Sequence, residues 1–307
     1  MKFAIVTVTY NDGKNLAQTM ASVKCQTYQD VMHVVVDGGS IDKTRDIFAQ
    51  FSDGRDQFHE IVDSGVYDAM NQAIDILEDV DFDYCVFLNA KDTFFQDATL
   101  EKICQSLKHV DTQPDILVGP YDFVTGNKRE VRNYPAAPGK IKQLLKENRL
   151  SECISSMPGH QATYYSKGFI KDKRYDLRFK IAADHNLFVN GLMSGAKIHN
   201  LLFPLCRYYS GGLSAQNLNR LQGEWLSIYA DASFSEREGL REFNRRDRLL
   251  PGADMMLTDN AQLLGAAFPI EGPYADGPGR GQWLTQSQLI ALSTHTCLLY
   301  TSPSPRD

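Results

Sequence analysis

The chain has 307 residues, of which 43% are hydrophobic and 23% charged, so a sizeable folded core is expected rather than general disorder. A formal net charge of −6 lacks the overall basic field of a sequence-independent nucleic-acid binder, and nucleic acid is not an expected partner. No apolar run approaches the roughly 20 residues that span a bilayer, and the apolar start is too short for an export signal. We expect a cytoplasmic protein whose membrane contact, if any, is peripheral on the inner face.

The first half of the sequence alternates short apolar runs with helical patterns. Strands are predicted at 3–8, 31–36, 58–62 and 84–88, and helices at 15–25, 42–51 and 67–77. This alternation predicts an α/β fold with a Rossmann-like, mostly parallel central sheet and helices on both faces. In such sheets, ligands bind beyond the carboxyl ends of the strands.

The regular alternation fades after Leu107. Residues 115–118 and 160–165 are further strand candidates, and 140–150 has the pattern of a basic amphipathic helix. Such a helix either packs on the sheet with a solvated basic edge or lies at a membrane surface.

Polar residues follow each of the first four predicted strands. One aspartate after a strand is commonly a helix cap or turn residue, but four successive polar clusters at one edge indicate a ligand site. The clusters are Thr9, Tyr10 and Asn11 after the first strand, Asp37 after the second, Asp63 after the third, and 89–92 after the fourth.

The segment 4–44, with its VTVTYN and VVVDGGSIDKT runs, resembles the opening of family 2 glycosyltransferases, which have the GT-A fold. The resemblance implies that Thr9, Tyr10 and Asn11 line a nucleotide pocket. It also implies that Asp37 contacts the base or ribose, where a carboxylate accepts strong hydrogen bonds. Asp42 is expected either to brace the following turn together with a nearby serine or to serve only as a helix cap.

A second block at 63–71, DSGVYDAMN, is similar to the D-x-G-I-Y-D-A-M-N signature of a polysaccharide-building, colanic-acid-type branch of the family. The resemblance implies donor-binding roles for Asp63, Gly65, Asp68 and Asn71. A glycine within the block permits close approach of the backbone to a ligand. The Glu-Pro pair that usually precedes the signature is absent from this chain.

A third block, FLNAKD at 87–92, stands where the family carries its D-x-D-like motif. The resemblance implies that Asp92 binds Mg²⁺ or Mn²⁺, since hard cations need oxygen ligands, and that Asn89 belongs to the donor site. Lys91 departs from the pattern. It could turn outward, assist the diphosphate directly, or mark a loss of activity.

Two later segments, HQA at 160–162 and KIAADHNL at 180–187, resemble elements of the same branch. The resemblance implies that His160 lies near the donor phosphates or the acceptor and that Asp184 is the catalytic base, with Asp68 as the alternative. Apart from the resemblance, Asp184 is also suited to the first turn of a helix, where the macrodipole stabilises an acidic residue.

Together, these resemblances imply an inverting hexosyltransferase of surface polysaccharide synthesis. It would move a sugar from a UDP-sugar or GDP-sugar to a saccharide or lipid-linked saccharide acceptor. A catalytically silent sugar-nucleotide-binding protein is the alternative. A Rossmann dehydrogenase would need G-x-G-x-x-G after the first strand, and a nucleotidyltransferase a glycine-rich basic loop, and neither is present.

We expect a glycosyltransferase domain over 1–215, with a nucleotide-sugar-binding half at 1–108 and an acceptor half at 109–215. A helical segment at 216–250 and a loosely packed region at 251–296 should follow. The final CLLYTSPSPRD at 297–307 resembles a translated sequencing adapter and is therefore excluded from the fold prediction.

Overall fold

The computed structural model describes residues 1–126, 128–132, 135–147 and 149–236. The chain divides into two compact units, one of Met1–Pro138 with Ser156–Gly212, the other of Gly139–Ser155 with the chain from Leu213 onward. Every strand of the described residues belongs to the first unit. The segments predicted at 251–296 and 297–307 lie outside the described residues, as does the end of the segment predicted at 216–250.

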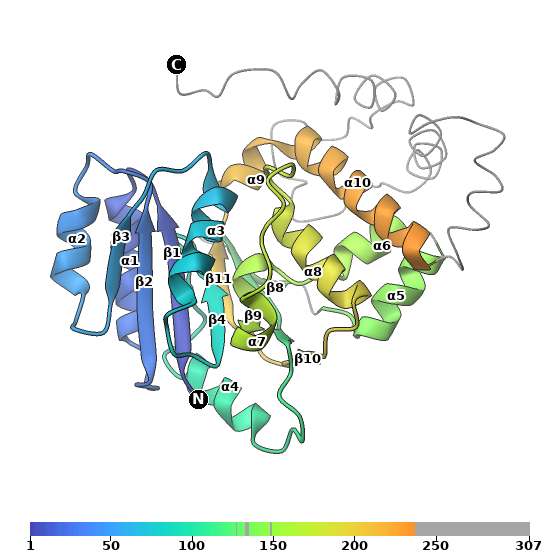
Figure 1. The fold of residues 1–307 in the computed structure, drawn as a ribbon, viewed down its shortest axis with the longest axis horizontal. Coiled ribbons are helices and arrows are strands. Elements are labelled where there is room, and N and C mark those ends of the chain that lie inside the picture. The colour runs from blue at the N-terminus through green and yellow to red at the C-terminus, as the bar shows by residue number, and fades with distance from the viewer. Residues whose placement is uncertain (127, 133–134, 148, 237–307) are drawn as a thin grey trace. The chain divides into compact units, whose positions relative to one another are not determined.

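The first unit is built on a seven-stranded sheet in the order β10-β6-β9-β4-β1-β2-β3. The strands are β1 (Phe3–Thr9), β2 (Val31–Asp37), β3 (Gln57–Glu60), β4 (Tyr84–Phe87), β6 (Ile116–Val118), β9 (Thr163–Ser166) and β10 (Ile198–Asn200). The strands β3, β2, β1 and β4 are parallel and lie side by side (Figure 1), and β9 runs antiparallel between β4 and β6. The predicted mostly parallel α/β sheet is confirmed.

Helices cover this sheet. They are α1 (Gly13–Lys24), α2 (Thr44–Phe51), α3 (Val66–Leu77), α4 (Thr99–Leu107), η1 (His160–Ala162), α7 (Lys167–Ile170) and α8 (Ala183–Met193). The helices α1, α2 and α3 correspond to those predicted at 15–25, 42–51 and 67–77, whereas the strand predicted at 160–165 begins at Thr163 after a short 3-10 helix. Leu16 and Met20 of α1 form a buried cluster with Val35 of β2, against which Ile47 and Phe51 of α2 pack. The central strand β1 is buried along its whole length, as expected for a strand covered on both faces.

A second, four-stranded sheet in the order β5-β11-β7-β8 is not predicted from the sequence. Its strands are β5 (Thr93–Phe94), β11 (Cys206–Tyr209), β7 (Tyr121–Thr125) and β8 (Lys128–Arg132). A two-residue strand such as β5 gives no periodic signal, and β11 pairs with strands that lie far away in the sequence. This sheet matters to the site because β11 returns the chain to the segment that follows β4.

The second unit contains α5 (Pro138–Lys146), which begins at its border, α6 (Leu150–Ser155), α9 (Leu213–Gln216) and α10 (Leu218–Glu236). The single helix predicted at 140–150 is thus two helices. Ile141, Leu144 and Leu145 of α5 are at most 1% exposed, so these side chains are buried, as in a packed helix. None of the described helices is long and apolar enough to cross a membrane.

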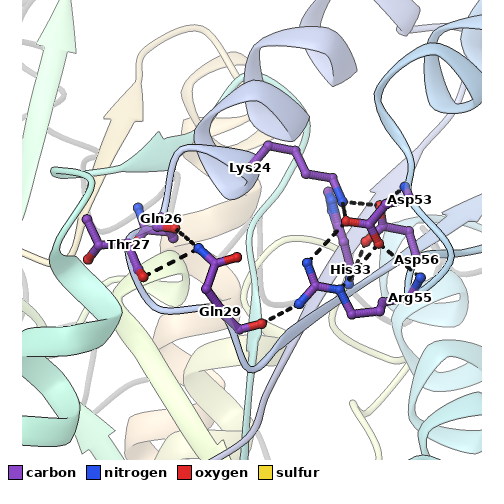
Figure 2. Close-up of polar contacts among 8 residues, drawn as sticks. All are labelled: Lys24, Gln26, Thr27, Gln29, His33, Asp53, Arg55 and Asp56. Carbon is purple, nitrogen blue, oxygen red and sulfur yellow. Dashed lines mark hydrogen bonds and ion pairs between the residues drawn. The ribbon is translucent and has the colours of Figure 1, made fainter.

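At the amino end of β2 and β3, charged side chains form a network with one another (Figure 2). The Lys24 ammonium forms ion pairs with Asp53, at 2.8 Å, and with Asp56, whose side chain is 3% exposed. Arg55 pairs with Asp53 at 3.1 Å and donates to the backbone carbonyl of Gln29. In this amino-end network, the buried Asp56 carboxylate therefore has the Lys24 ammonium as its cationic partner.

His33 of β2 lies beside this network and is fully buried. The Thr7 hydroxyl donates to the Leu88 carbonyl at 2.7 Å, so the Thr7 oxygen accepts from His33 Nε2–H at 2.9 Å. The ring is thereby fixed as the Nε2–H tautomer, and Nδ1 is buried without a hydrogen-bond partner. Burial lowers the pKa of His33 to about 4, and the negative charge of Asp56 only partly opposes this shift.

Candidate active site

The loops that follow β1 and β2 are tied to each other by hydrogen bonds. The backbone N–H of Asn11 donates to Ser40 Oγ at 2.7 Å, and the backbone N–H of Ile41 donates to Asn11 Oδ1 at 2.9 Å. The Asp37 carboxylate, only 2% exposed, accepts from the backbone N–H of Ser40 at 2.8 Å and from the Ser40 hydroxyl. Asn11 and Asp37, both predicted to bind the donor, therefore fix the shape of these two loops.

Asp42 joins the start of α1 to the start of α2. Its carboxylate accepts from the backbone N–H of Gly13 at 3.1 Å, and from the backbone N–H and hydroxyl of Thr44 at 3.0 and 2.5 Å. The Thr44 hydroxyl holds the pKa of Asp42 below its ordinary value. Asp42 therefore braces the starts of both helices, while the N-cap position of α2 is Lys43.

Gly38 lies where the Tyr10 ring and the Asp63 carboxylate meet. A Cβ atom at this position would stand 2.5 Å from Asp63 Oδ2 and 3.5 Å from Tyr10 Cδ2, so a side chain here would displace the carboxylate. Asp63 Oδ1 accepts from the backbone N–H of Gly65 at 2.8 Å, and Gly65 has a φ of +137°, a value that favours glycine. The Tyr10 ring is 50% exposed. An exposed ring beside a fixed carboxylate can stack on a flat heteroaromatic group and accept its N–H groups.

The predicted donor-binding residues on α3, Asp68 and Asn71, make hydrogen bonds within the protein, and their contact with a donor stays a prediction. The Asp68 carboxylate accepts from the backbone N–H of Ser64 at 2.7 Å and from the Ser64 hydroxyl at 2.9 Å, which closes the first turn of the helix. The Asn71 amide donates to the backbone carbonyl of Tyr175 at 2.9 Å and accepts from its N–H at 2.7 Å. Both side chains therefore hold the start of α3 and the segment at Tyr175 in place.

Two buried side-chain oxygens at the ends of neighbouring strands have no hydrogen-bond partner. They are Oγ1 of Thr9, at the end of β1, and Oδ1 of Asn89, just after β4. An unsatisfied buried polar group costs about 1–3 kcal/mol, and such groups in a folded protein call for an explanation such as a bound ligand. Thr9 and Asn89 are therefore the donor-binding candidates whose side-chain oxygens are available to bond to a ligand.

Asp92 is 3% exposed and lies between β11 and η1, two elements that are far from it in the sequence. Its Oδ1 accepts from the backbone N–H of Tyr209 on β11 at 2.9 Å, and its Oδ2 accepts from the Gln161 amide on η1 at 2.8 Å. Burial raises the pKa of Asp92 to about 7, and the two neutral donors only partly oppose this shift. The carboxylate thus holds β11 and η1 against the segment that follows β4.

The metal predicted at Asp92 does not fit this arrangement. Both carboxylate oxygens are directed at protein donors, and the preceding residue is the cationic Lys91. Among the described residues, no three His, Cys, Asp or Glu side chains lie close enough together to hold a metal ion. Mg²⁺ is commonly bound by one or two carboxylates together with substrate phosphates, so the two hydrogen bonds on Asp92, rather than the number of acidic groups, disfavour this site. Asp92 as a metal ligand stays a prediction.

Asp184 lies in the first turn of α8, as predicted. Its Oδ1 accepts from the Tyr67 hydroxyl at 2.8 Å, and the same hydroxyl lies 2.7 Å from the backbone carbonyl of Ile181. Tyr67 belongs to α3 and is 9% exposed, so its position is fixed by the core. The interaction joins the Asp63–Asn71 block to the predicted base, two regions more than 100 residues apart in sequence.

Asp184 and His160 line the same small cavity, about 10 Å³ in volume, which is close to the space that one water molecule needs. His185, Thr163 and Tyr165 contribute further polar groups to the lining. Both ring nitrogens of His160 are buried without a hydrogen-bond partner. Burial lowers the pKa of His160, so a neutral ring faces the Asp184 carboxylate.

Three residues that position the site are not predicted from the sequence, namely Tyr67, Gln161 and Tyr209. Tyr67 has the spacing of a core residue, and its hydroxyl was the one signal of a polar role. Gln161 adjoins His160 in the HQA segment, which marks it for attention. Tyr209 contributes a backbone N–H, for which no side-chain pattern exists.

The architecture is that of GT-A glycosyltransferases, as comparison with solved structures shows. S. aureus TarS 1-349 in complex with UDP aligns with a TM-score of 0.58 and 16% identity over 85% of this chain and 80% of that chain. The mannosyltransferase PcManGT from Pyrobaculum calidifontis, in complex with GDP-Man and Mn²⁺, aligns with a TM-score of 0.56 and 15% identity over 98% and 88%.

The sequence matches glycosyl transferase family 2 over residues 4–169, more than half of the chain, and the chain belongs to this family. It is 29% identical over 218 residues to a PGL/p-HBAD biosynthesis glycosyltransferase of Mycobacterium bovis BCG, covering 69% of this chain and 78% of the relative. It is 27% identical over 214 residues to an uncharacterized glycosyltransferase of Mycobacterium tuberculosis, covering 69% and 76%.

Proposed function

We propose that this member of glycosyl transferase family 2 moves a sugar from a nucleoside-diphosphate sugar to a hydroxyl of a saccharide or lipid-linked saccharide, with inversion at the anomeric carbon. The observation that carries the proposal is the Asp184 carboxylate, which lines a cavity together with His160 and is held by the Tyr67 hydroxyl. A carboxylate fixed in this way beside a neutral histidine is suited to accept a proton from a hydroxyl group.

The donor class is supported by the carboxyl edge of β1, β2 and β4. Tyr10 and Asp63 meet at Gly38, where a nucleoside base could stack and bond, and Thr9 and Asn89 hold unsatisfied oxygens nearby on neighbouring strands. TarS has been solved with UDP and with UDP-GlcNAc, and PcManGT with GDP-Man. Both lines of support favour a UDP-sugar or GDP-sugar as the donor.

In the proposed reaction, the Asp184 carboxylate takes the proton of the acceptor hydroxyl while the acceptor oxygen forms a bond to the anomeric carbon. The bond from that carbon to the diphosphate oxygen breaks, and the nucleoside diphosphate leaves with the bonding electron pair. General-base assistance of this kind contributes about 10²- to 10⁴-fold to the rate. No covalent bond between sugar and protein is required.

Two further features of the proposal are the transferred sugar and the acceptor. A role in surface polysaccharide synthesis, with a hexose as the transferred sugar, rests on the sequence resemblance. For a lipid-linked acceptor, membrane contact through the apolar residues of α5 has no support, because Ile141, Leu144 and Leu145 are buried. The basic residues of that helix remain the groups that could face an anionic surface.

The test is nucleoside diphosphate release from a panel of UDP-sugars and GDP-sugars with mixed saccharide acceptors. We expect turnover by the wild type, and a kcat about 10²- to 10⁴-fold lower for Asp184→Asn with donor affinity within about threefold. Asp172→Asn, which removes the same charge from an exposed position, is the matched control.

Two results would contradict the proposal. Near-normal turnover by Asp184→Asn would remove the base from this position, and Asp68 is a poor substitute because Ser64 occupies its carboxylate. Donor binding by the wild type without turnover of any sugar would favour the silent sugar-nucleotide-binding protein instead.

A further inference from the structure

Lys91 adopts a backbone conformation that is unusual for a residue with a side chain. Its φ is +85°, and among the described non-glycine residues only Asn11 shares a positive φ. The backbone is held there by α1, because the Lys91 N–H donates to the Asn15 carbonyl at 3.1 Å and the Lys91 carbonyl accepts from the Gln18 amide at 2.8 Å. Strained positions of this kind persist where the surrounding structure fixes them, and they concentrate at functional sites.

The side chain of Lys91 is fixed as well. Its ammonium donates to the backbone carbonyl of Ser210, just after β11, at 2.9 Å. An ammonium has three donors, so this bond leaves two for another partner. Within the described part of the chain, the Lys91 ammonium forms no ion pair with a carboxylate, in contrast to Lys24 at the other end of the sheet.

Positive charge is otherwise scarce at this edge. In the loops 10–12, 61–65, 88–92 and 210–212, which follow β1, β3, β4 and β11, Lys91 is the one basic residue. The loop after β2 adds Lys43, whose side chain is exposed. A diphosphate that gains negative charge as it leaves needs a cation close by, so Lys91 is the best-placed group in these loops to provide it.

Lys91 is also connected to the cavity that holds the proposed base. The next residue, Asp92, accepts a hydrogen bond from Gln161 at 2.8 Å, and Gln161 adjoins His160 in η1. His160 and Asp184 line the cavity together. The ammonium therefore belongs to the same set of loops as the proposed reacting groups.

We propose that the Lys91 ammonium supplies the positive charge for the donor diphosphate in place of a divalent cation, so that nucleotide binding needs no added metal. The inference rests on the proposed function. It follows from three observations taken together: the fixed ammonium without an acidic partner, the lack of any other basic residue in these loops except the exposed Lys43, and the Asp92 oxygens already directed at Tyr209 and Gln161. The lysine keeps its proton throughout, because the acceptor proton goes to Asp184.

The test is isothermal titration calorimetry of UDP and GDP, in EDTA and again in Mn²⁺. For the wild type, we expect the better of the two nucleotides to bind in EDTA with an affinity within about threefold of that in Mn²⁺. Lys91→Gly should bind at least tenfold more weakly, and Lys91→Arg should retain most of the affinity because it keeps the charge. Lys108→Met, at an exposed position after α4, is the control for loss of a lysine charge.

Lys91→Gly separates charge from folding, since glycine adopts a φ of +85° without strain. Its Tm should equal or exceed that of the wild type, and Lys91→Met, which keeps the strain, should lose nucleotide affinity to the same extent. Wild-type binding that disappears in EDTA and returns with Mn²⁺ would overturn the inference and leave the proposed function standing, as would wild-type affinity in Lys91→Gly. Absence of UDP and GDP binding under both conditions would instead overturn the proposed function, and this inference with it.

Discussion

At the amino end of the seven-stranded sheet, the buried Asp56 carboxylate faces the Lys24 ammonium, whereas at the carboxyl end the buried Asp92 carboxylate faces the neutral donors of Gln161 and Tyr209. The side chain of Asp56 is 3% exposed, and the whole of Asp92 is 3% exposed. The two carboxylates therefore differ in the charge of their partners far more than in burial.

This difference separates groups that stabilise the fold from groups that are available to a ligand. In the amino-end network, each charge has a partner of opposite sign (Figure 2). Beside this network, one buried atom of the described residues, Nδ1 of His33, has no hydrogen-bond partner. At the carboxyl end, the described part of the proposed site has four such atoms, namely the side-chain oxygens of Thr9 and Asn89 and both ring nitrogens of His160. Uncompensated polar groups reduce stability, and proteins retain them mainly where function requires them.

The largest expected effect on stability comes from breaking the amino-end pair. Lys24→Met leaves the Asp56 carboxylate buried without its cation, and we expect the free energy of unfolding to fall by about 3 kcal/mol in urea denaturation at pH 7. Lys14→Met, an exposed lysine of the same helix, should change it by less than about 0.5 kcal/mol. Equal effects of the two substitutions would show that the network does not stabilise the fold.

Acid should weaken the same end of the sheet through His33. Its pKa is lowered from 6.5 to about 4 in the folded protein, so the neutral ring favours folding above pH 6.5 and this advantage is lost as the pH falls toward 4. Between pH 8 and pH 5 the loss should reach about 2 kcal/mol. The measurement compares urea denaturation of the wild type and His33→Gln across this range. Parallel pH profiles of the two proteins would contradict the expectation.

An effect of opposite sign is expected at the carboxyl end. The pKa of Asp92 is raised from 3.8 to about 7, so its ionisation opposes folding increasingly as the pH rises from 5 to 8. Asp92→Asn removes this cost, and the Gln161 amide can turn so that its oxygen accepts from the new amide. We expect the free energy of unfolding of Asp92→Asn, relative to the wild type, to rise by about 2 to 3 kcal/mol between pH 5 and pH 8. If Asp92→Asn instead lowered the free energy of unfolding as much as Lys24→Met does, the proposed difference between the two ends of the sheet would be contradicted.

The sequence predicts the sheet and the edge that carries the site because both depend on local patterns. Apolar runs ended by polar residues locate β1, β3 and β4, and they place Thr9, Asp63 and Asn89 at one edge of the sheet. The strand predicted at 58–62 ends earlier, at Glu60, and Val62 is 92% exposed.

What the sequence could not supply is the partner of each polar side chain. Asn71 bonds to the backbone of Tyr175, and Asp92 to the backbone of Tyr209, both more than 100 residues away. Motif similarity therefore identifies these residues as important but does not reveal the internal hydrogen bonds that they make. Tyr67 shows the opposite case. Its spacing in the sequence is that of an apolar core residue, yet its hydroxyl donates a hydrogen bond to Asp184.

The most direct test of the contrast between the two ends is an NMR titration of the ¹⁵N-labelled chain with UDP and GDP. We expect the amide signals of Gly38, Gly65 and Lys91 to shift on binding, while those of His33 and Asp56 stay in place. Shifts concentrated at the amino-end network, or saturable binding that leaves the three carboxyl-end signals unchanged, would contradict the assignment of the nucleotide site to the carboxyl edge of the sheet.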